Sequence, residues 1–345
     1  MEDMGAFRSG LELNALFYEK VIGPALAGID HAAARLGSGS EVLGFDTERS
    51  TDHGWGPRLL VLVGEQHVDG ALAKVEAALP EDFEGFPVRY GWDDIPVTHH
   101  VTVTTIGSWL VEQLGVDVTA DLSATDWLVL PQQKLLEVTA GAVYHDDGAV
   151  MDRLRAALAW YPDDVWVWML AAQWRRIAQE EAFVGRTAEV GDDLGSRLVT
   201  ARLGRELMRL WFLVCRTYWP YTKWFGSAFG RLPGAASLGR ALRSALQADD
   251  YQSREAALVE AYRIVARRHN ELGVADAVDP EVRLYYGRPY RVLMADRFVE
   301  ACLARVTSPE LNRLPLVGSI DQVADATDLL QYPERVNRIR ALYGS

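Results

Sequence analysis

The sequence has few cysteines and no long apolar run. Only Cys215 and Cys302 occur among the 345 residues, which excludes a disulfide framework and a cysteine-rich metal site. The most apolar stretches, such as residues 166–172, are far shorter than the roughly 20 residues that a membrane-spanning helix needs. We therefore expect a protein of a reducing compartment that does not cross a membrane.

The sequence is also short of positive charge. Lys and Arg number 35 against 48 Asp and Glu, which leaves a formal net charge of −13. Nucleic acid and anionic membranes attract clustered cations, so neither is an expected partner. A small basic pocket could still hold one nucleotide, so a small-molecule substrate is expected and the oligomeric state stays open. The first ten residues hold Glu2 and Asp3 and no apolar segment, so we expect no signal peptide and a cytoplasmic protein.

The first 140 residues predict an α/β domain with a mixed sheet. Helix and strand patterns alternate along this part of the chain, as in sheets covered by helices. The expected helices are 11–36, interrupted at Gly23-Pro24, and 68–79; the expected strands are 41–45, 58–63 and 97–105.

From about residue 120 the pattern is helical only. Residues 141–345 are therefore expected to form an all-α domain, with a boundary in the region 120–150 and no flexible linker. Asp163 and Asp164 follow Pro162 at the start of the first long helix, where acids favour the helix dipole. The expected helices are 163–189, 194–217, 235–248, 253–272, 289–306 and 333–343. Most of the 11 tryptophans lie in this region, which favours a large helical core and also permits a pocket for a flat or apolar substrate.

The densest cluster of chemically active residues spans residues 36–58. A Gly/Ser turn, Gly37-Ser38-Gly39-Ser40, lets backbone N–H groups and hydroxyls approach an anion. Carboxylates follow within a few residues, at Asp46, Glu48 and Asp52. A turn that holds phosphates, beside oxygen ligands for a metal, is what Mg²⁺–nucleotide chemistry requires.

These residues resemble the nucleotidyltransferase superfamily of the polymerase-β type. Gly39-Ser40 is followed by Gly44 and then by Asp52, which matches the superfamily pattern. The second acid of its Asp-x-Asp pair would stand at position 54, where this chain has Gly54, and the third acid would stand on the strand that carries Thr102 and Thr104.

The chain also resembles, over nearly its whole length, a bacterial family of unknown function placed near the nucleotidyltransferases. That family has Asp-His-Asp where this chain has Asp52-His53-Gly54. The resemblance rests on residues 44–46, 52–53, 55–58, 179–186, 191–192 and 221–226.

This resemblance implies a polymerase-β-like fold, Mg²⁺ and ATP or another NTP as cofactors, and a small-molecule acceptor. Asp52 and Asp46 would bind the metal, and Gly39, Ser40 and Gly44 would cradle the triphosphate. The helical domain would donate Glu181 or Glu180 as the general base. Arg58, Arg186 and Lys223 could hold phosphates.

Two questions stay open at the level of sequence. A second register, Gly37-Ser38 followed by Asp46-Thr47-Glu48, would supply a complete acid pair. Three functions also compete: nucleotidyl transfer to a small molecule, a degenerate protein that binds a nucleotide or metabolite without catalysis, and a biosynthetic enzyme that uses the same cleft for other chemistry.

Overall fold

The chain divides into two compact units. In the computed structural model, which describes residues 7–116, 118 and 121–344, one unit comprises Met1–Asp121 and Lys134–Ala159, and the other comprises Leu122–Gln133 and Trp160–Ser345. We call them the sheet unit and the helical unit. The expectation about an N-terminal signal falls partly on residues 1–6, which lie outside the described residues.

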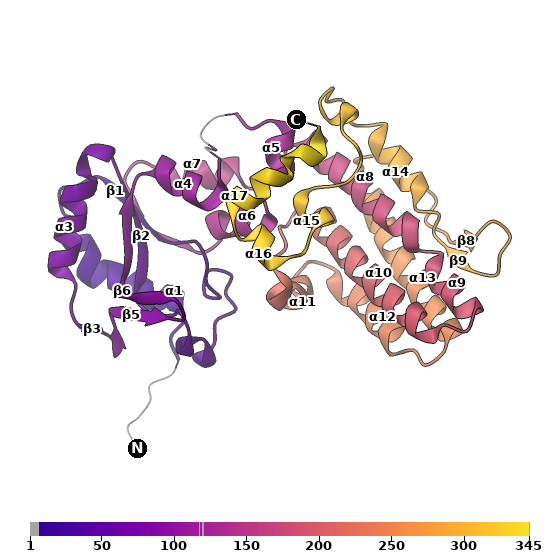
Figure 1. The fold of residues 1–345 in the computed structure, drawn as a ribbon, viewed down its shortest axis with the longest axis horizontal. Coiled ribbons are helices and arrows are strands. Elements are labelled where there is room, and N and C mark those ends of the chain that lie inside the picture. Colours follow the sequence, from indigo (N-terminus) through magenta and orange to yellow (C-terminus); the bar gives the residue numbers. More distant parts are fainter. Residues whose placement is uncertain (1–6, 117, 119–120, 345) are drawn as a thin grey trace, which may run out of the picture. The chain divides into compact units, whose positions relative to one another are not determined.

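The sheet unit is built on a five-stranded mixed sheet in the order β5-β6-β2-β1-β7 (Figure 1). β2 and β6 are parallel, and the other pairs are antiparallel. The strands are β1 (His31–Arg35), β2 (Arg58–Val63), β3 (Asp82–Phe83), β4 (Phe86–Pro87), β5 (Arg89–Trp92), β6 (Ile95–Thr104) and β7 (Ala142–Asp146). The helices are α1 (Gly10–Phe17), the π-helix η1 (Tyr18–Ile22), α2 (Gly23–Ala25), the 3₁₀-helices η2 (Glu48–Asp52) and η3 (Glu65–His67), α3 (Val68–Ala78), α4 (Ile106–Leu114), α6 (Gln132–Thr139) and α7 (Val150–Ala157).

One face of the sheet packs against α1 and α3. Leu13 and Phe17 of α1 and Val75 of α3 join a buried core with Val61 of β2 and Val101 of β6. The apolar run of β2 is buried on both faces, as expected for an interior strand. The predictions of β2, β6 and α3 are therefore confirmed.

Two predictions around residues 30–45 are wrong. The helix expected over 11–36 ends at Ala25, and residues 31–35 form β1 in the sheet interior. The strand expected at 41–45 is a turn, in which the Phe45 N–H donates to the Ser40 carbonyl (2.9 Å). Alanines favour helices in isolation, but Ala32–Ala34 are buried between β2 and β7, and this tertiary pairing outweighs their local preference.

The division into units differs from the expected boundary at residue 140. β7, at 142–146, is an edge strand of the sheet and α7 belongs to the same unit, whereas residues 122–133 belong to the helical unit. β7 has only five residues, and the sequence around it is typical of a turn. Its pairing with β1 is a long-range contact that local pattern does not reveal.

The helical unit contains most of the long helices expected from the sequence. They are α8 (Asp163–Glu180), α9 (Phe183–Glu189), α10 (Asp193–Val214), α12 (Ala235–Gln247) and α13 (Tyr251–Glu271). However, the helix expected over 163–189 is divided in two at residues 181–182, and the helix expected over 289–306 forms only over 296–303, after a short strand at 291–292. The shorter elements are α5 (Ala124–Val129), α11 (Thr222–Gly230), β8 (Arg283–Leu284), β9 (Arg291–Val292), α14 (Asp296–Leu303), η4 (Leu311–Arg313), α15 (Ile320–Val323), α16 (Thr327–Leu330), α17 (Pro333–Asn337) and η5 (Arg338–Tyr343). The mixed sheet with a separate helical region confirms the expected fold class, and none of the described helices is long and apolar enough to span a membrane.

Tryptophan side chains form much of the core of the helical unit. Trp166, Trp168 and Trp174 on α8 are almost fully buried, and Trp174 stacks on Phe298 of α14 with ring centroids 4.3 Å apart. The Trp166 Nε1–H donates to the Leu213 carbonyl of α10 (2.8 Å), so its polar atom is satisfied inside the core. These buried tryptophans support the interpretation that the tryptophan-rich region forms a large helical core.

Candidate functional site

The Gly/Ser turn of the sheet unit is organised around a buried ion pair. The Arg35 guanidinium donates to Glu41 Oε1 from Nε (3.0 Å) and Nη2 (2.6 Å). The same guanidinium donates to the carbonyls of Leu36 and Ser38, so the turn wraps around it. Both side chains are about 97% buried (2% and 3% exposed). The predicted anion-binding turn therefore presents two of its carbonyls to an internal cation.

Gly39 is required by this arrangement. Its φ is +144°, and a Cβ at this position would lie 2.5 Å from Arg35 Nη2 and 2.6 Å from the Glu41 carboxylate oxygens. Ser40 and Gly44 lie in the same turn, where the Gly44 N–H donates to the Glu41 carbonyl (3.0 Å). The structure thus brings Gly39, Ser40 and Gly44 together in one turn, as the sequence predicts. This turn lies around the ion pair of Arg35 and Glu41.

The candidate metal-binding acids differ in their contacts and exposure. Asp46 Oδ2 accepts from the Gly10 N–H (2.7 Å) and from Trp55 Nε1–H (3.2 Å), so this carboxylate ties the loop to the start of α1. Asp52 is exposed at the end of η2, and Glu48, the acid of the alternative register, is exposed at its beginning. Among the described residues, the single group of three His, Cys, Asp or Glu side chains close enough to share a metal lies elsewhere.

A tryptophan ring lies where the missing acid of the family pattern would stand. Gly54 has φ +60°, and a Cβ built on it would lie 3.1 Å from the Trp92 indole. Thr102 and Thr104 on β6 pair with Leu60 and Leu62 of β2. The described carboxylates therefore do not fit a two-metal clamp, which needs several acids that converge on the ions.

Arg58, at the start of β2, lies in an aromatic cluster. Its Cζ is 5.6 Å from the centroid of the Trp92 ring, and Nη2 lies 3.4 Å from Ser38 Oγ. Among the described residues, no carboxylate oxygen lies within 4.0 Å of this guanidinium. Burial, followed by the positive charge of Arg35, lowers the pKa of Arg58 to about 10. The charges of Tyr90, Glu41 and Glu137 act in the opposite direction, and Arg58 remains a half-buried cation at neutral pH with no carboxylate within ion-pair distance among the described residues.

Three rings of β5 and β6 complete this cluster. Tyr90 and Trp92 stack with centroids 5.9 Å apart, and His100 lies 4.3 Å from Tyr90 and 4.9 Å from Trp92. Burial lowers the pKa of His100, whose Nε2–H donates to the Tyr90 carbonyl (2.9 Å), and burial raises the pKa of Tyr90 to about 12. We call Arg58, Tyr90, Trp92 and His100 the arginine–aromatic site. Sequence analysis missed its rings because β5 is short and only the strand pairing brings it beside Arg58 and His100.

The predicted base residues of the helical unit have structural partners. Glu181 is buried at the end of α8, where its carboxylate accepts from the N–H groups of Leu293 (2.7 Å), Met294 (3.2 Å) and Ala295 (2.9 Å), just before α14. Burial raises its pKa to about 7 despite these three donors. Glu180 forms an ion pair with Arg202 (2.9 Å), and burial raises its pKa as well.

The two predicted phosphate-binding cations of the helical unit are exposed. Arg186 on α9 lies over the Phe183 ring at 5.9 Å, and Lys223 on α11 lies over the Trp224 ring at 5.0 Å. Each has its own aromatic neighbour, and neither shares a partner with Glu181. Arg186 and Lys223 therefore lie on different helices, each beside its own aromatic ring.

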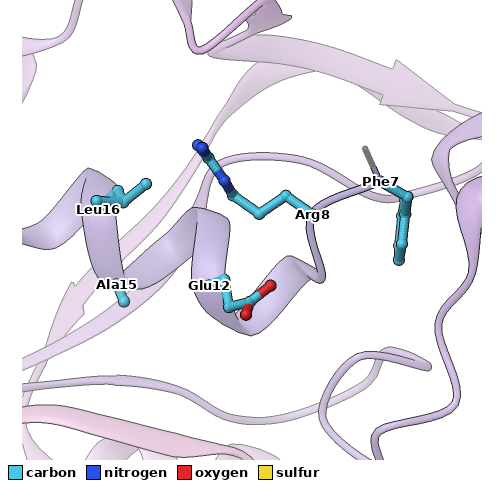
Figure 2. A pocket seen from close by; sticks show the side chains of 5 residues that line it. All are labelled: Phe7, Arg8, Glu12, Ala15 and Leu16. Carbon is cyan, nitrogen blue, oxygen red and sulfur yellow. The ribbon is translucent and has the colours of Figure 1, made fainter. Parts of the chain in front are cut away.

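A shallow hollow of about 430 Å³ lies beside α1 and is lined by Phe7, Arg8, Glu12, Ala15 and Leu16 (Figure 2). Its charged groups are already engaged, because Arg8 pairs with Glu84 (3.1 Å) and Glu12 completes a capping box with Ser9. The hollow therefore offers less to a ligand than the arginine–aromatic site does.

One comparison with known protein families bears on the resemblance seen in the sequence. A family model described as a domain of unknown function (DUF4037) matches residues 127–225. No curated protein matches the chain. A solved structure, a nucleotidyltransferase-like protein from Exiguobacterium sibiricum 255-15, is similar with a TM-score of 0.35 and 11% sequence identity, over 76% of this chain and 78% of that one. The expected likeness to a family of unknown function is confirmed by the first match, which includes residues 179–186 and 191–192.

Proposed function

We propose that the sheet unit binds a nucleotide, or a metabolite that likewise joins an anionic group to a flat ring, at the arginine–aromatic site. One observation carries this proposal: the Arg58 guanidinium is half-buried, charged and without a carboxylate partner among the described residues. A cation in such a place costs solvation free energy, which an anionic ligand offsets.

The chemistry of the site suits such a ligand. The planar guanidinium of Arg58 can bind two oxygens of a phosphate or carboxylate at once. Tyr90, Trp92 and His100 offer ring faces and edges within 6 Å of one another, by the 5.9, 4.3 and 4.9 Å separations of their centroids. Ligand sites combine a few oriented polar groups with an aromatic lining in this way.

Binding without metal-dependent catalysis is the function that this geometry supports best. Asp46 is held by Gly10 and Trp55, and position 54 carries a glycine covered by Trp92. Nucleotidyl transfer from an NTP to a small molecule is the second candidate, and the exposed carboxylate of Asp52 is the feature that favours it. If transfer occurs, the Asp52→Ala variant should lose NTP turnover while it remains folded.

Arg58→Ala should weaken binding of a non-hydrolysable ATP analogue by at least about 30-fold. Truncation of one member of a buried charge pair costs about 2 kcal/mol or more, and each 1.4 kcal/mol is roughly tenfold in affinity. Calorimetric titration of the full chain, in Mg²⁺ and in EDTA, measures this change. Arg89→Ala is the matched control, because Arg89 is an exposed arginine on β5, the strand that carries Tyr90 and Trp92.

The same titrations decide between the candidates. Micromolar binding that persists in EDTA and depends on Arg58 supports the proposal. Binding that requires Mg²⁺ and is lost in Asp52→Ala, together with NTP turnover, supports nucleotidyl transfer. If analogues of ATP, GTP and CTP all fail to bind, nucleotide binding is ruled out for this site.

A further inference from the structure

Sheet pairing brings three metal-ligating side chains together at the edge formed by β1 and β7. His31 begins β1, His145 lies in β7, and Asp147 follows β7 directly. Ala33 pairs with His145 across the two strands, and the His31 N–H donates to Asp147 Oδ2 (3.0 Å) while the Asp147 N–H donates to the His31 carbonyl (3.2 Å). Residues more than a hundred positions apart are therefore held in one place by the backbone.

The donor atoms have separations that suit a small cation. His145 Nε2 lies 2.9 Å from Asp147 Oδ2, and His31 Nδ1 lies 3.9 Å from the same oxygen. The Ile29 carbonyl oxygen lies 2.7 Å from His31 Nδ1. All three side chains offer ligand atoms within 4.8 Å of one another. Metal–ligand bonds of about 2.0–2.2 Å place tetrahedral ligand atoms about 3.3–3.6 Å apart, so small side-chain movements would lengthen the 2.7 and 2.9 Å contacts and shorten the 3.9 Å contact on binding.

We propose that His31, His145 and Asp147 form a binding site for a divalent transition-metal ion of the Zn²⁺ class, with the Ile29 carbonyl as a fourth donor. Two imidazoles and a carboxylate favour such an ion over Mg²⁺ or Ca²⁺, which take oxygen ligands. The site joins the start of β1 to the end of β7 and is separate in residues from the arginine–aromatic site.

The surroundings of His31 support this assignment. His31 is 92% buried (8% exposed), and its Nε2 lies 3.0 Å from the Tyr18 hydroxyl. Without metal, Nδ1–H donates to the Ile29 carbonyl and Nε2 accepts from Tyr18. With metal on Nδ1, the proton resides on Nε2 and the Tyr18 oxygen accepts it, so Tyr18 is an outer partner in both states. Metal-bound histidines commonly have such a partner on the second nitrogen.

An ion pair between His145 and Asp147 is the alternative explanation of their 2.9 Å contact. That ion pair does not involve His31, whose Nδ1 also lies 3.9 Å from the same carboxylate and whose ring stacks on that of His145 with centroids 4.4 Å apart. A shared metal accounts for both rings and for the carboxylate at once.

Binding of Co²⁺ to the purified full chain tests the site. Co²⁺ in a site with nitrogen ligands should give visible absorption bands, and Zn²⁺ should abolish them by competition. Loss of an outer partner weakens metal binding by about 10–100-fold, so Tyr18→Phe should have an effect of this size. His145→Ala and Asp147→Asn change a metal ligand itself, so each should weaken Co²⁺ binding by more than about 100-fold. His145 and Asp147 are 35% and 40% exposed, so these variants should fold.

His99→Ala is the control, because His99 on β6 is a histidine of the same unit that lies 3.9 Å from a carboxylate, that of Glu76, outside the proposed site. This variant should bind Co²⁺ as the native chain does. The proposal is overturned if the native chain gives no competed Co²⁺ bands, or if His145→Ala retains native affinity. Equal losses in His99→Ala and His145→Ala would also overturn it, because binding would then be non-specific.

Discussion

Glu41→Ala should destabilise the sheet unit by about 3–5 kcal/mol, the cost of removing one partner from a buried ion pair. The Arg35 guanidinium would remain 2% exposed, with only the carbonyls of Leu36 and Ser38 to solvate its charge. Because these carbonyls belong to the Gly/Ser turn, the turn should loosen with the pair. Ligand binding at Arg58 should weaken as well, since Ser38 Oγ lies beside its guanidinium.

Hydrogen exchange followed by mass spectrometry measures this effect locally. Amides of β1 and of residues 36–45 should exchange much faster in Glu41→Ala than in the native chain, and the urea midpoint of the unit should fall. Glu48→Ala is the control, because Glu48 is an exposed acid of the same loop. Native exchange rates in Glu41→Ala would show that the ion pair does not hold the turn.

Glu181→Ala should destabilise the helical unit by about 3–5 kcal/mol. The substitution leaves the N–H groups of Leu293, Met294 and Ala295 without their acceptor, and each unsatisfied buried donor costs about 1–3 kcal/mol. Urea unfolding followed by tryptophan fluorescence reports on this unit, where most of the 11 tryptophans lie. Glu180→Ala should cost only about 0–1 kcal/mol, because its contact with Arg202 is a partly exposed ion pair.

The pH dependence of the same measurement follows from the raised pKa of Glu181. Burial raises this pKa from 4.5 to about 7, so the folded state holds the proton more tightly than the unfolded state does. The contribution is fully present below about pH 4.5 and is lost as the pH rises through about 7, by up to about 3 kcal/mol. Glu181→Gln cannot titrate, so the stability difference between native and variant chains should shrink by this amount from pH 4.5 to pH 8.

Turnover tests a catalytic role for Glu181 separately. As a general base, Glu181 would be required for NTP turnover, so Glu181→Gln would lose turnover, whereas the pH dependence of stability follows from the raised pKa with or without catalysis. Two results together identify the Glu181 carboxylate as the acceptor for the N–H groups before α14. Glu181→Ala should lose stability, and Glu181→Gln should lack the pH dependence of the native chain.

Sequence alone determined the elements whose local patterns are strong. The apolar run of β2, the β-branched β6 and the long helices α8, α10, α12 and α13 each follow from local sequence pattern. It also determined the two-part organisation and the cluster of residues 36–58, because a Gly/Ser turn followed by acids is visible without a structure.

Tertiary structure decided the rest, because long-range pairing overrides or adds to local preference. Ala32–Ala34 became a strand through burial between β2 and β7, although alanine favours helix. Partners distant in sequence determined the hydrogen bonds of Glu181, placed Trp92 against Gly54, and stacked His31 on His145. Residue spacing identifies which chemical groups a chain contains, but the packing of distant segments determines which of those groups meet.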